Sequence, residues 1–153
     1  MKKVFAGIVL AAFIGVLCIA SSAQAITQDE AKNLVSKVVA FWKANGKDKT
    51  LAEVSNTKGS FVKGDLYAFC NDFNGNVLAN GGNPALVGQN HLELKDPTGK
   101  VFNKEMINLV KTKGSGWSDY SWVNPVSKKV QPKTTFIQRI EGTDIYCGSG
   151  IWK

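Results

Sequence analysis

Apolar residues recur every three or four positions between residues 27 and 44, which is the spacing of one face of an α-helix. Thr27 is a good capping residue and Glu30 follows three positions later, so the two form a capping box. The pattern predicts an amphipathic helix over this range, and a second box at Thr50 and Glu53 predicts a short helix after it. The apolar stripe of the first helix consists of Ala31, Leu34, Val35, Val38, Val39 and Trp42.

Beyond residue 64 the apolar pattern changes to an alternation of period two, which is typical of β-strands. Residues 66–71 and 77–79 are predicted to form a hairpin around Asn74-Gly75, a strong signal for a tight turn. Tyr67 and Phe69 should then lie on one face of the sheet. The opposite face should carry Leu66, Ala68 and Cys70.

Residues 80–100 show no regular pattern, whereas residues 101–113 return to helical spacing and are followed by Gly114. An irregular segment of this length in a small domain is often functional, although a surface loop held by turns is the equal alternative. Together the irregular segment and the helix of residues 101–113 are expected to form a lid over one face of the sheet. The inward side chains of that helix should be Phe102, Met106, Leu109 and Val110.

A second hairpin is predicted from residues 116–124 and 132–140, because both arms alternate and Asn124-Pro125 cannot continue a ladder. Tyr120 and Trp122 share one face of the first arm, with Ser118. The second arm places Lys133 on one side, with Thr135, Ile137 and Arg139. The hairpin could therefore set two aromatic rings with polar edges beside a cation, which suits a small anion.

The first 25 residues have the three parts of a secretory signal peptide. Lys2 and Lys3 precede an apolar run from residue 4 to 20, and Ala23-Gln24-Ala25 is a cleavage motif. A membrane anchor is the alternative, but the run is short for a span of ~20 apolar residues. Cys18 follows a leucine rather than the small residue of a lipobox, so we expect it to leave with the signal. The mature protein should be one domain over residues 26–153, periplasmic or secreted and without a membrane anchor.

Charge and motifs argue against several classes of function. The net charge of +7 falls to +5 without Lys2 and Lys3, and the remaining lysines are scattered, so a nucleic-acid surface is poorly supported. His91 is the sole histidine, the chain has no Gly-x-Ser-x-Gly motif, and no metal-binding spacing is present. We therefore predict that the protein is not an enzyme and uses no metal or cofactor.

Seven short segments follow one another in a fixed order: Gly64–Phe69, Asn74–Asn80, Asn83–Asn90, Leu94–Phe102, Lys113–Pro125, Pro132-Lys133 and Gly148–Trp152. In this order they resemble the single Cache domain, type 2, of bacterial extracytoplasmic sensors. The resemblance implies an α+β fold: a PAS-like antiparallel sheet with a long N-terminal helix and a loop and helix lid. It also implies a pocket on one sheet face, which binds small organic acids in many relatives.

A carboxylate ligand requires a charged donor and directional neutral donors in a partly dry pocket. Lys133 would supply the charge, Tyr67 and Tyr120 hydroxyl groups, and Trp122 a wall or an indole donor. Asn80 would supply an amide where relatives often have histidine, which leaves the identity of the ligand open. The alternative for Trp122 is a plain core residue, and for Lys133 a solvated strand end.

The resemblance favours a periplasmic binding or sensing module for a C2–C3 carboxylate. The chain has no second transmembrane segment after the domain, so a separate membrane sensor protein is the expected partner in signalling. The alternatives are an interaction or inhibitory protein that binds another periplasmic protein, and, less favoured, a hydrolase that uses His91.

Two cysteines remain after removal of the signal peptide, in a compartment that permits disulfides. Cys70 lies in the first long predicted strand and Cys147 in the last, residues 145–152. These strands are neighbours in the PAS-like order that the resemblance implies. The resemblance thus predicts a bridge between them, with two buried thiols as the alternative.

Overall fold

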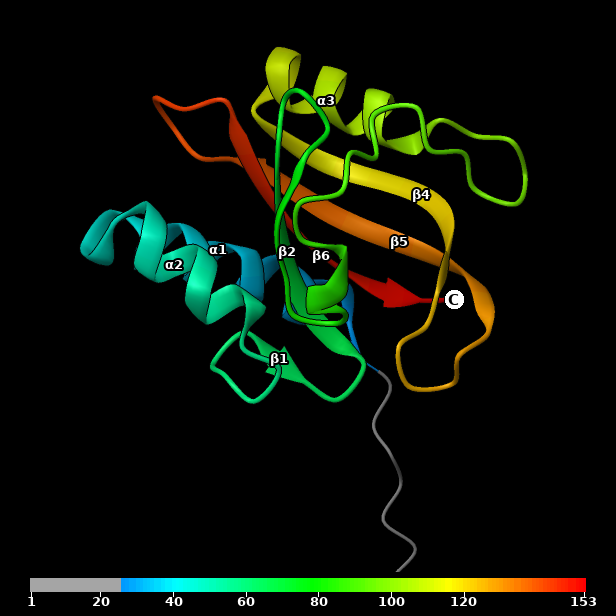
Figure 1. The fold of residues 1–153 in the computed structure, drawn as a ribbon, viewed down its shortest axis with the longest axis horizontal. Coiled ribbons are helices and arrows are strands. Elements are labelled where there is room, and N and C mark those ends of the chain that lie inside the picture. The colour runs from blue at the N-terminus through cyan, green and yellow to red at the C-terminus, as the bar shows by residue number, and fades with distance from the viewer. Residues whose placement is uncertain (1–25) are drawn as a thin grey trace, which may run out of the picture.

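A six-stranded antiparallel sheet forms the centre of the computed structural model, which describes residues 26–153 (Figure 1). The predicted signal peptide, residues 1–25 with Cys18, lies outside the described residues. The elements in chain order are α1 (Gln28–Asn45), α2 (Lys47–Ser55), β1 (Val62–Lys63), β2 (Leu66–Asp72), β3 (Val77–Asn80), the 3₁₀ turn η1 (Pro84–Leu86), α3 (Phe102–Lys113), β4 (Ser115–Val123), β5 (Val130–Arg139) and β6 (Ile145–Trp152).

The strand order is β1-β2-β6-β5-β4, and β3 also pairs with β2. β1 pairs with the beginning of β2 and β3 with its end, so the two short strands share one edge of the sheet. The first and last long strands, β2 and β6, are therefore neighbours at its centre. This order confirms the predicted PAS-like α+β fold.

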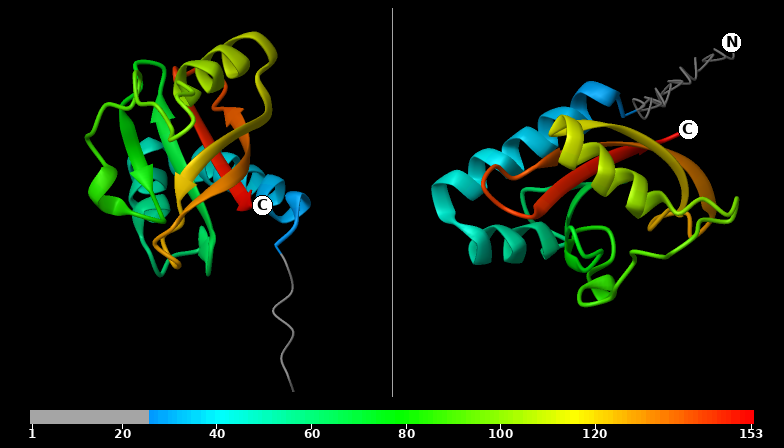
Figure 2. Two further views of the ribbon diagram at one scale, coloured as in Figure 1. Left: turned by 90° about the vertical axis from the view of Figure 1, so that its right-hand side faces the viewer. Right: turned by 90° about the horizontal axis from the view of Figure 1, so that it is seen from above.

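Helices α1 and α2 cover one face of the sheet (Figure 2). The predicted box at the start of α1 is confirmed: Thr27 Oγ1 accepts from the Glu30 amide at 3.2 Å, and the Glu30 carboxylate accepts from the Thr27 amide at 2.8 Å. The helix buries its apolar stripe against one side of β2 and β6, and a hydrophobic core forms between the helix and these strands. The buried residues include Ala31, Leu34, Val38, Leu66, Ala68, Cys70, Ile145 and Cys147.

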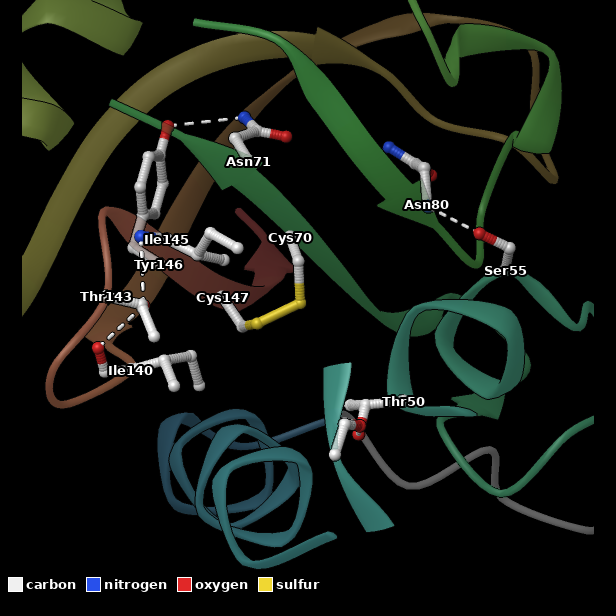
Figure 3. The surroundings of a disulfide bond; sticks show 11 residues. Thr50, Ser55, Cys70, Asn71, Asn80, Ile140, Thr143, Ile145, Tyr146 and Cys147 are labelled. Carbon is white, nitrogen blue, oxygen red and sulfur yellow. Dashed lines mark hydrogen bonds between the residues drawn. A yellow bond between two sulfur atoms is a disulfide. The ribbon is translucent and has the colours of Figure 1, made fainter. Parts of the chain in front are cut away.

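Cys70 and Cys147 form a disulfide in this core (Figure 3). They stand directly opposite each other in the pairing of β2 with β6, and their Cα atoms are 4.0 Å apart. Both cysteines are fully buried. The bridge ties the two central strands together and confirms the predicted pairing.

The predicted start of the second helix at a Thr50 box is wrong. Helix α2 begins at Lys47, directly after α1, because Gly46 adopts a positive φ of 79° and turns the chain without a linker. Thr50 is a buried residue inside the helix, and its hydroxyl donates to the Gly46 carbonyl at 2.7 Å. Glu53 accepts instead from the Ser60 amide at 2.7 Å, so it fixes the turn after the helix.

The opposite face of the sheet is covered by α3 and by the segment of residues 81–100, as predicted for the lid. In Figure 1, α3 runs along β4, away from α1 and α2. Asp96 fastens the segment to β4, because its carboxylate accepts from the Ser121 amide at 2.9 Å as well as from Thr98 and Lys100. Burial opposes ionisation, but these hydrogen bonds lower the pKa of Asp96 to about 2. The irregular segment is thus a loop held by turns that also covers the sheet.

Candidate functional site

A small pocket lies between the sheet, α3 and the covering segment. The centre of a water molecule can reach about 30 Å³ of it, enough for one or a few waters. Most of its lining comes from β2, β3, α3 and β4. The lining residues are Tyr67, Phe69, Asn71, Val77, Asn80, Leu86, His91, Phe102, Asn103, Met106, Tyr120 and Trp122.

Two glycines of β6 provide space on this face of the sheet. A Cβ atom on Gly148 would lie 2.6 Å from the Phe69 ring, and one on Gly150 would lie 2.2 Å from Thr135 Oγ1. Either contact is too short to occur without a shift of the neighbours. The Gly-Ser-Gly sequence near the C-terminus therefore lets side chains of β2 and β5 meet across the central strand.

Lys133 and Tyr67 meet in this way, above Gly150. Lys133 Nζ donates to the Tyr67 hydroxyl at 2.9 Å and lies 4.0 Å from the centre of its ring and 4.5 Å from that of Trp152. Lys133 is only 1% exposed, so the alternative of a solvated strand end is wrong. Burial lowers the pKa of Lys133 to about 7 and raises the pKa of Tyr67. Lys133 is not among the residues that line the pocket, whereas its partner Tyr67 is.

Tyr120 stands opposite Lys133 in the β4–β5 ladder and does line the pocket. Its ring stacks on Phe102 with centroids 4.5 Å apart, and its hydroxyl accepts from Thr135 Oγ1 at 3.4 Å. Burial raises the pKa of Tyr120 to about 12, so the phenol stays protonated. Tyr67 and Tyr120 thus each accept one hydrogen bond from β5, and among the described residues neither O–H donates to a partner.

Asn80 and Trp122 also line the pocket. Asn80 Oδ1 accepts from the backbone amides of Gly82 and Asn83 at 3.0 and 2.9 Å, so the loop uses its acceptor and orients its amide nitrogen. Trp122 is half-buried and packs edge-on against Phe102, with ring centroids 5.5 Å apart. The structure therefore brings four of the five predicted residues to the pocket, and Lys133 donates a hydrogen bond to one of them, Tyr67.

A polar group at the other end of the pocket was missed by the sequence analysis. Asn71 of β2, Asn103 of α3 and Tyr146 of β6 meet there in a buried hydrogen-bonded cluster. Asn71 continues the alternation of Tyr67 and Phe69, so the strand pattern could have placed it on the pocket face. Asn103 and Tyr146 gave no comparable signal, because they approach it only through the tertiary fold.

His91 lines the pocket beside this cluster. Its Nε2 lies 3.1 Å from Gln89 Oε1, and its backbone carbonyl accepts from Asn103 Nδ2 at 2.9 Å. Burial lowers the pKa of His91, so the imidazole is neutral at neutral pH. Within residues 26–153, no three His, Cys, Asp or Glu side chains are grouped closely enough to hold a metal ion.

An outer cavity adjoins the pocket and shares four lining residues with it. Its volume is about 450 Å³, and it lies between the loop of residues 82–86 and the β4–β5 turn. Lys128 stands at its edge and is the one residue other than glycine with a positive φ among residues 26–153. The four shared residues are Tyr67, Asn80, Leu86 and Trp122.

The profile of the Cache domain family matches residues 20–153, and the chain belongs to that family. The family is a sensory, non-catalytic module.

Two named relatives match over 88 residues, 58% of this chain, at 28% identity. They are the methyl-accepting chemotaxis protein McpP of Pseudomonas putida and the sensor histidine kinase MctS of Rhizobium johnstonii. The match spans 16% of the former and 19% of the latter, so the chain corresponds to a small part of each.

Solved structures show the same fold. A methyl-accepting chemotaxis protein from Vibrio parahaemolyticus superposes with a TM-score of 0.67 at 25% identity, over 81% of this chain and 86% of that one. A Cache chemosensory domain, described for its recognition of carboxylic acids, gives 0.64 at 26% identity over the same shares. A periplasmic sensor domain of a chemotaxis protein gives 0.62 at 25% identity, over 81% and 88% of the two chains. In the part of this chain that the structure describes, the helices are all too short or too polar to cross a membrane.

Proposed function

We propose that this Cache domain is a periplasmic or secreted sensing module that binds a small organic acid with two or three carbon atoms. The mature protein would begin at Ile26, after the predicted signal peptide. The names of its structural neighbours, a periplasmic sensor domain and a domain that recognises carboxylic acids, support this assignment. Transmission of the signal would fall to a separate membrane sensor protein, since the named relatives are a chemotaxis protein and a sensor kinase.

The observation that carries the proposal is the imbalance between donors and acceptors at the Tyr67 end of the pocket. None of the residues that line the described pocket is acidic. Tyr67 and Tyr120 have O–H groups to donate, and the amide nitrogen of Asn80 and the indole of Trp122 add neutral donors. A set of donors in a partly dry pocket is suited to a carboxylate.

Lys133 would act on the ligand through Tyr67. Its ammonium donates to the phenol oxygen at 2.9 Å, which polarises the hydroxyl and makes it a stronger donor. The positive charge also lies close enough to attract an anion bound at Tyr67, since the surroundings are buried and screen it weakly. The described pocket would thus bind an anion with neutral donors in contact and a cation behind them.

The size of the pocket limits both the ligand and its affinity. The small free volume favours acids of two or three carbon atoms over longer ones. Acetate has about four non-hydrogen atoms, and at a ceiling of ~1.5 kcal/mol per atom it can gain about 6 kcal/mol. This corresponds to a dissociation constant of tens of micromolar at best, on the order of 40 µM.

The test compares acids with their uncharged amides, which have nearly the same shape. Propionate and lactate should raise the melting temperature, and propionamide and lactamide should not. At ~100 times the dissociation constant the acid should stabilise the protein by about 2.7 kcal/mol. If no small acid shifts the melting temperature and calorimetry detects no binding, the carboxylate assignment is wrong. Binding to a periplasmic protein through the basic surface would then replace it.

A further inference from the structure

The far end of the pocket contains a buried hydrogen-bond acceptor that has no partner among the described residues. Asn71 is 5% exposed and lines the pocket, and its Oδ1 atom accepts no hydrogen bond from the described residues. Its Nδ2 atom is engaged, since it donates to the Tyr146 hydroxyl at 3.2 Å and faces Asn103 Oδ1 at 3.5 Å. Figure 3 shows the nitrogen turned toward Tyr146 and the oxygen turned away from it.

The surrounding network fixes this orientation of the amide. The Tyr146 hydroxyl donates its hydrogen to Asn103 Oδ1 at 3.1 Å, and Asn103 Nδ2 donates to the His91 carbonyl at 2.9 Å. If the Asn71 amide were reversed, its oxygen would face a tyrosine oxygen whose hydrogen is already used. The unpaired atom at this end is therefore an acceptor, opposite in character to the donors around Tyr67 and Tyr120.

We propose that the ligand is a small hydroxy acid, with its carboxylate at the Tyr67 and Tyr120 hydroxyls and its own hydroxyl donating to Asn71 Oδ1. This inference rests on the proposed carboxylate function and names the chemical class within it. A buried polar atom in a folded protein is nearly always paired, so an acceptor left open in a pocket indicates a donor on what binds there. Asn71 is then the residue that determines specificity.

Other small acids do not match this end of the pocket. Plain acids and 2-oxo acids have no hydrogen to donate to Asn71 Oδ1. An amino acid has donors, but its ammonium would be buried where none of the described lining residues is acidic and where His91 is neutral. Burial of a charge without a counter-charge is far more costly than burial of a hydroxyl. A hydroxyl group is therefore the donor that fits.

A water molecule bound at Asn71 is the competing explanation, since the free space of about 30 Å³ admits one. The two explanations predict different selectivities. If a water satisfies Asn71 whatever the ligand, hydroxy acids and plain acids of the same size bind alike. If the ligand satisfies it, the acid without a hydroxyl leaves the acceptor unpaired and binds more weakly.

Isothermal titration calorimetry of the parent protein decides between a bound water and a ligand hydroxyl at Asn71. Two matched pairs are compared, glycolate with acetate and lactate with propionate, and pyruvate is added as the 2-oxo acid. We expect each hydroxy acid to bind about tenfold or more tightly than its partner, and pyruvate to bind no better than propionate. Equal affinities within both pairs would overturn the hydroxy-acid inference and leave the carboxylate function standing. If none of these acids binds, the hydroxy-acid inference and the carboxylate function are both wrong.

A variant then assigns the preference to Asn71. Asn71→Leu keeps a similar volume and removes the acceptor, so the preference for lactate over propionate should be lost, whatever the variant does to the affinity for both acids. Asn108→Leu is the matched control, because Asn108 is exposed on α3 outside the pocket. An Asn71→Leu protein that is folded by circular dichroism and still prefers lactate would overturn the role of Asn71. If this variant does not fold, the ratios measured on the parent decide the inference by themselves.

Discussion

Substitution of Lys133 by methionine should weaken ligand binding and stabilise the free protein, two effects of opposite sign. Lys133→Met keeps the length of the side chain and removes a cation that is 1% exposed. Among the described residues, the ammonium makes one hydrogen bond, to Tyr67, and otherwise faces the rings of Tyr67 and Trp152. Replacement of a buried charge by an apolar group of similar volume is often neutral or stabilising.

The stability effect depends on pH, and the structure gives its sign. Burial lowers the pKa of Lys133 to about 7 in the folded protein, whereas an unfolded lysine titrates near 10.4. Between these values the unfolded chain binds more protons, so the free energy of unfolding rises with pH. At ~1.36 kcal/mol per pKa unit the rise from about pH 7 to pH 9.5 is roughly 2 to 3 kcal/mol. Burial raises the pKa of Tyr67, so that residue acts in the opposite direction only above about pH 10.

Urea denaturation at several pH values between about 7 and 9.5 measures this rise. We expect it in the parent and in Lys129→Met, a control at an exposed position of the β4–β5 turn, and we expect a flat profile in Lys133→Met. The variant should also be more stable than the parent at about pH 7, where the buried cation is half populated.

The effect on affinity should be a loss of about tenfold, or ~1.4 kcal/mol. This is near the lower end of the range for hydrogen bonds to charged groups, because the ammonium acts on the ligand through the Tyr67 hydroxyl. In the parent the affinity should also fall as pH rises above about 7, since Lys133 then loses its charge. Titration calorimetry with propionate or lactate at about pH 6 and pH 8.5 measures both quantities. If Lys133→Met binds acid with the parent's constant and pH dependence, the cation is not part of the site.

Two further predictions concern the sheet. Replacement of both Cys70 and Cys147 by alanine should lower the free energy of unfolding by about 4 kcal/mol, because their bridge closes a loop with a sequence separation of 77. Urea denaturation measures the loss of stability, and an unchanged denaturation midpoint would contradict the prediction. Gly150→Ala should abolish acid binding and cost ~1 to 3 kcal/mol of stability, because the new methyl group would lie 2.2 Å from Thr135 Oγ1 and 2.9 Å from Lys133 Cε. Calorimetry and thermal denaturation test this, and a Gly150→Ala protein that binds acid like the parent would show that the space above β6 is not required.

Local patterns in the chain were enough to predict most of the secondary structure and the faces of its strands. The apolar stripe of α1, the alternation of β2 and the β4–β5 hairpin were predicted because side chains at helical or strand spacing must share a face whatever they pack against. The same local argument put Tyr120 beside Lys133 on one side of the sheet. It failed at α2, where Gly46 allows a tighter connection between helices than the spacing of Thr50 and Glu53 suggested.

What these side chains meet depends on the packing of the elements. Lys133 meets Tyr67 because Gly150 on the intervening strand leaves room for the two side chains to meet across it, and no local pattern showed this contact. The cluster of Asn71, Asn103 and Tyr146 joins positions far apart in the chain, so no local pattern could have shown that one acceptor stays unpaired. Periodicity fixes the face on which a residue lies, but the residues across a pocket, and so the chemistry of the pocket, depend on how the strands and α3 pack.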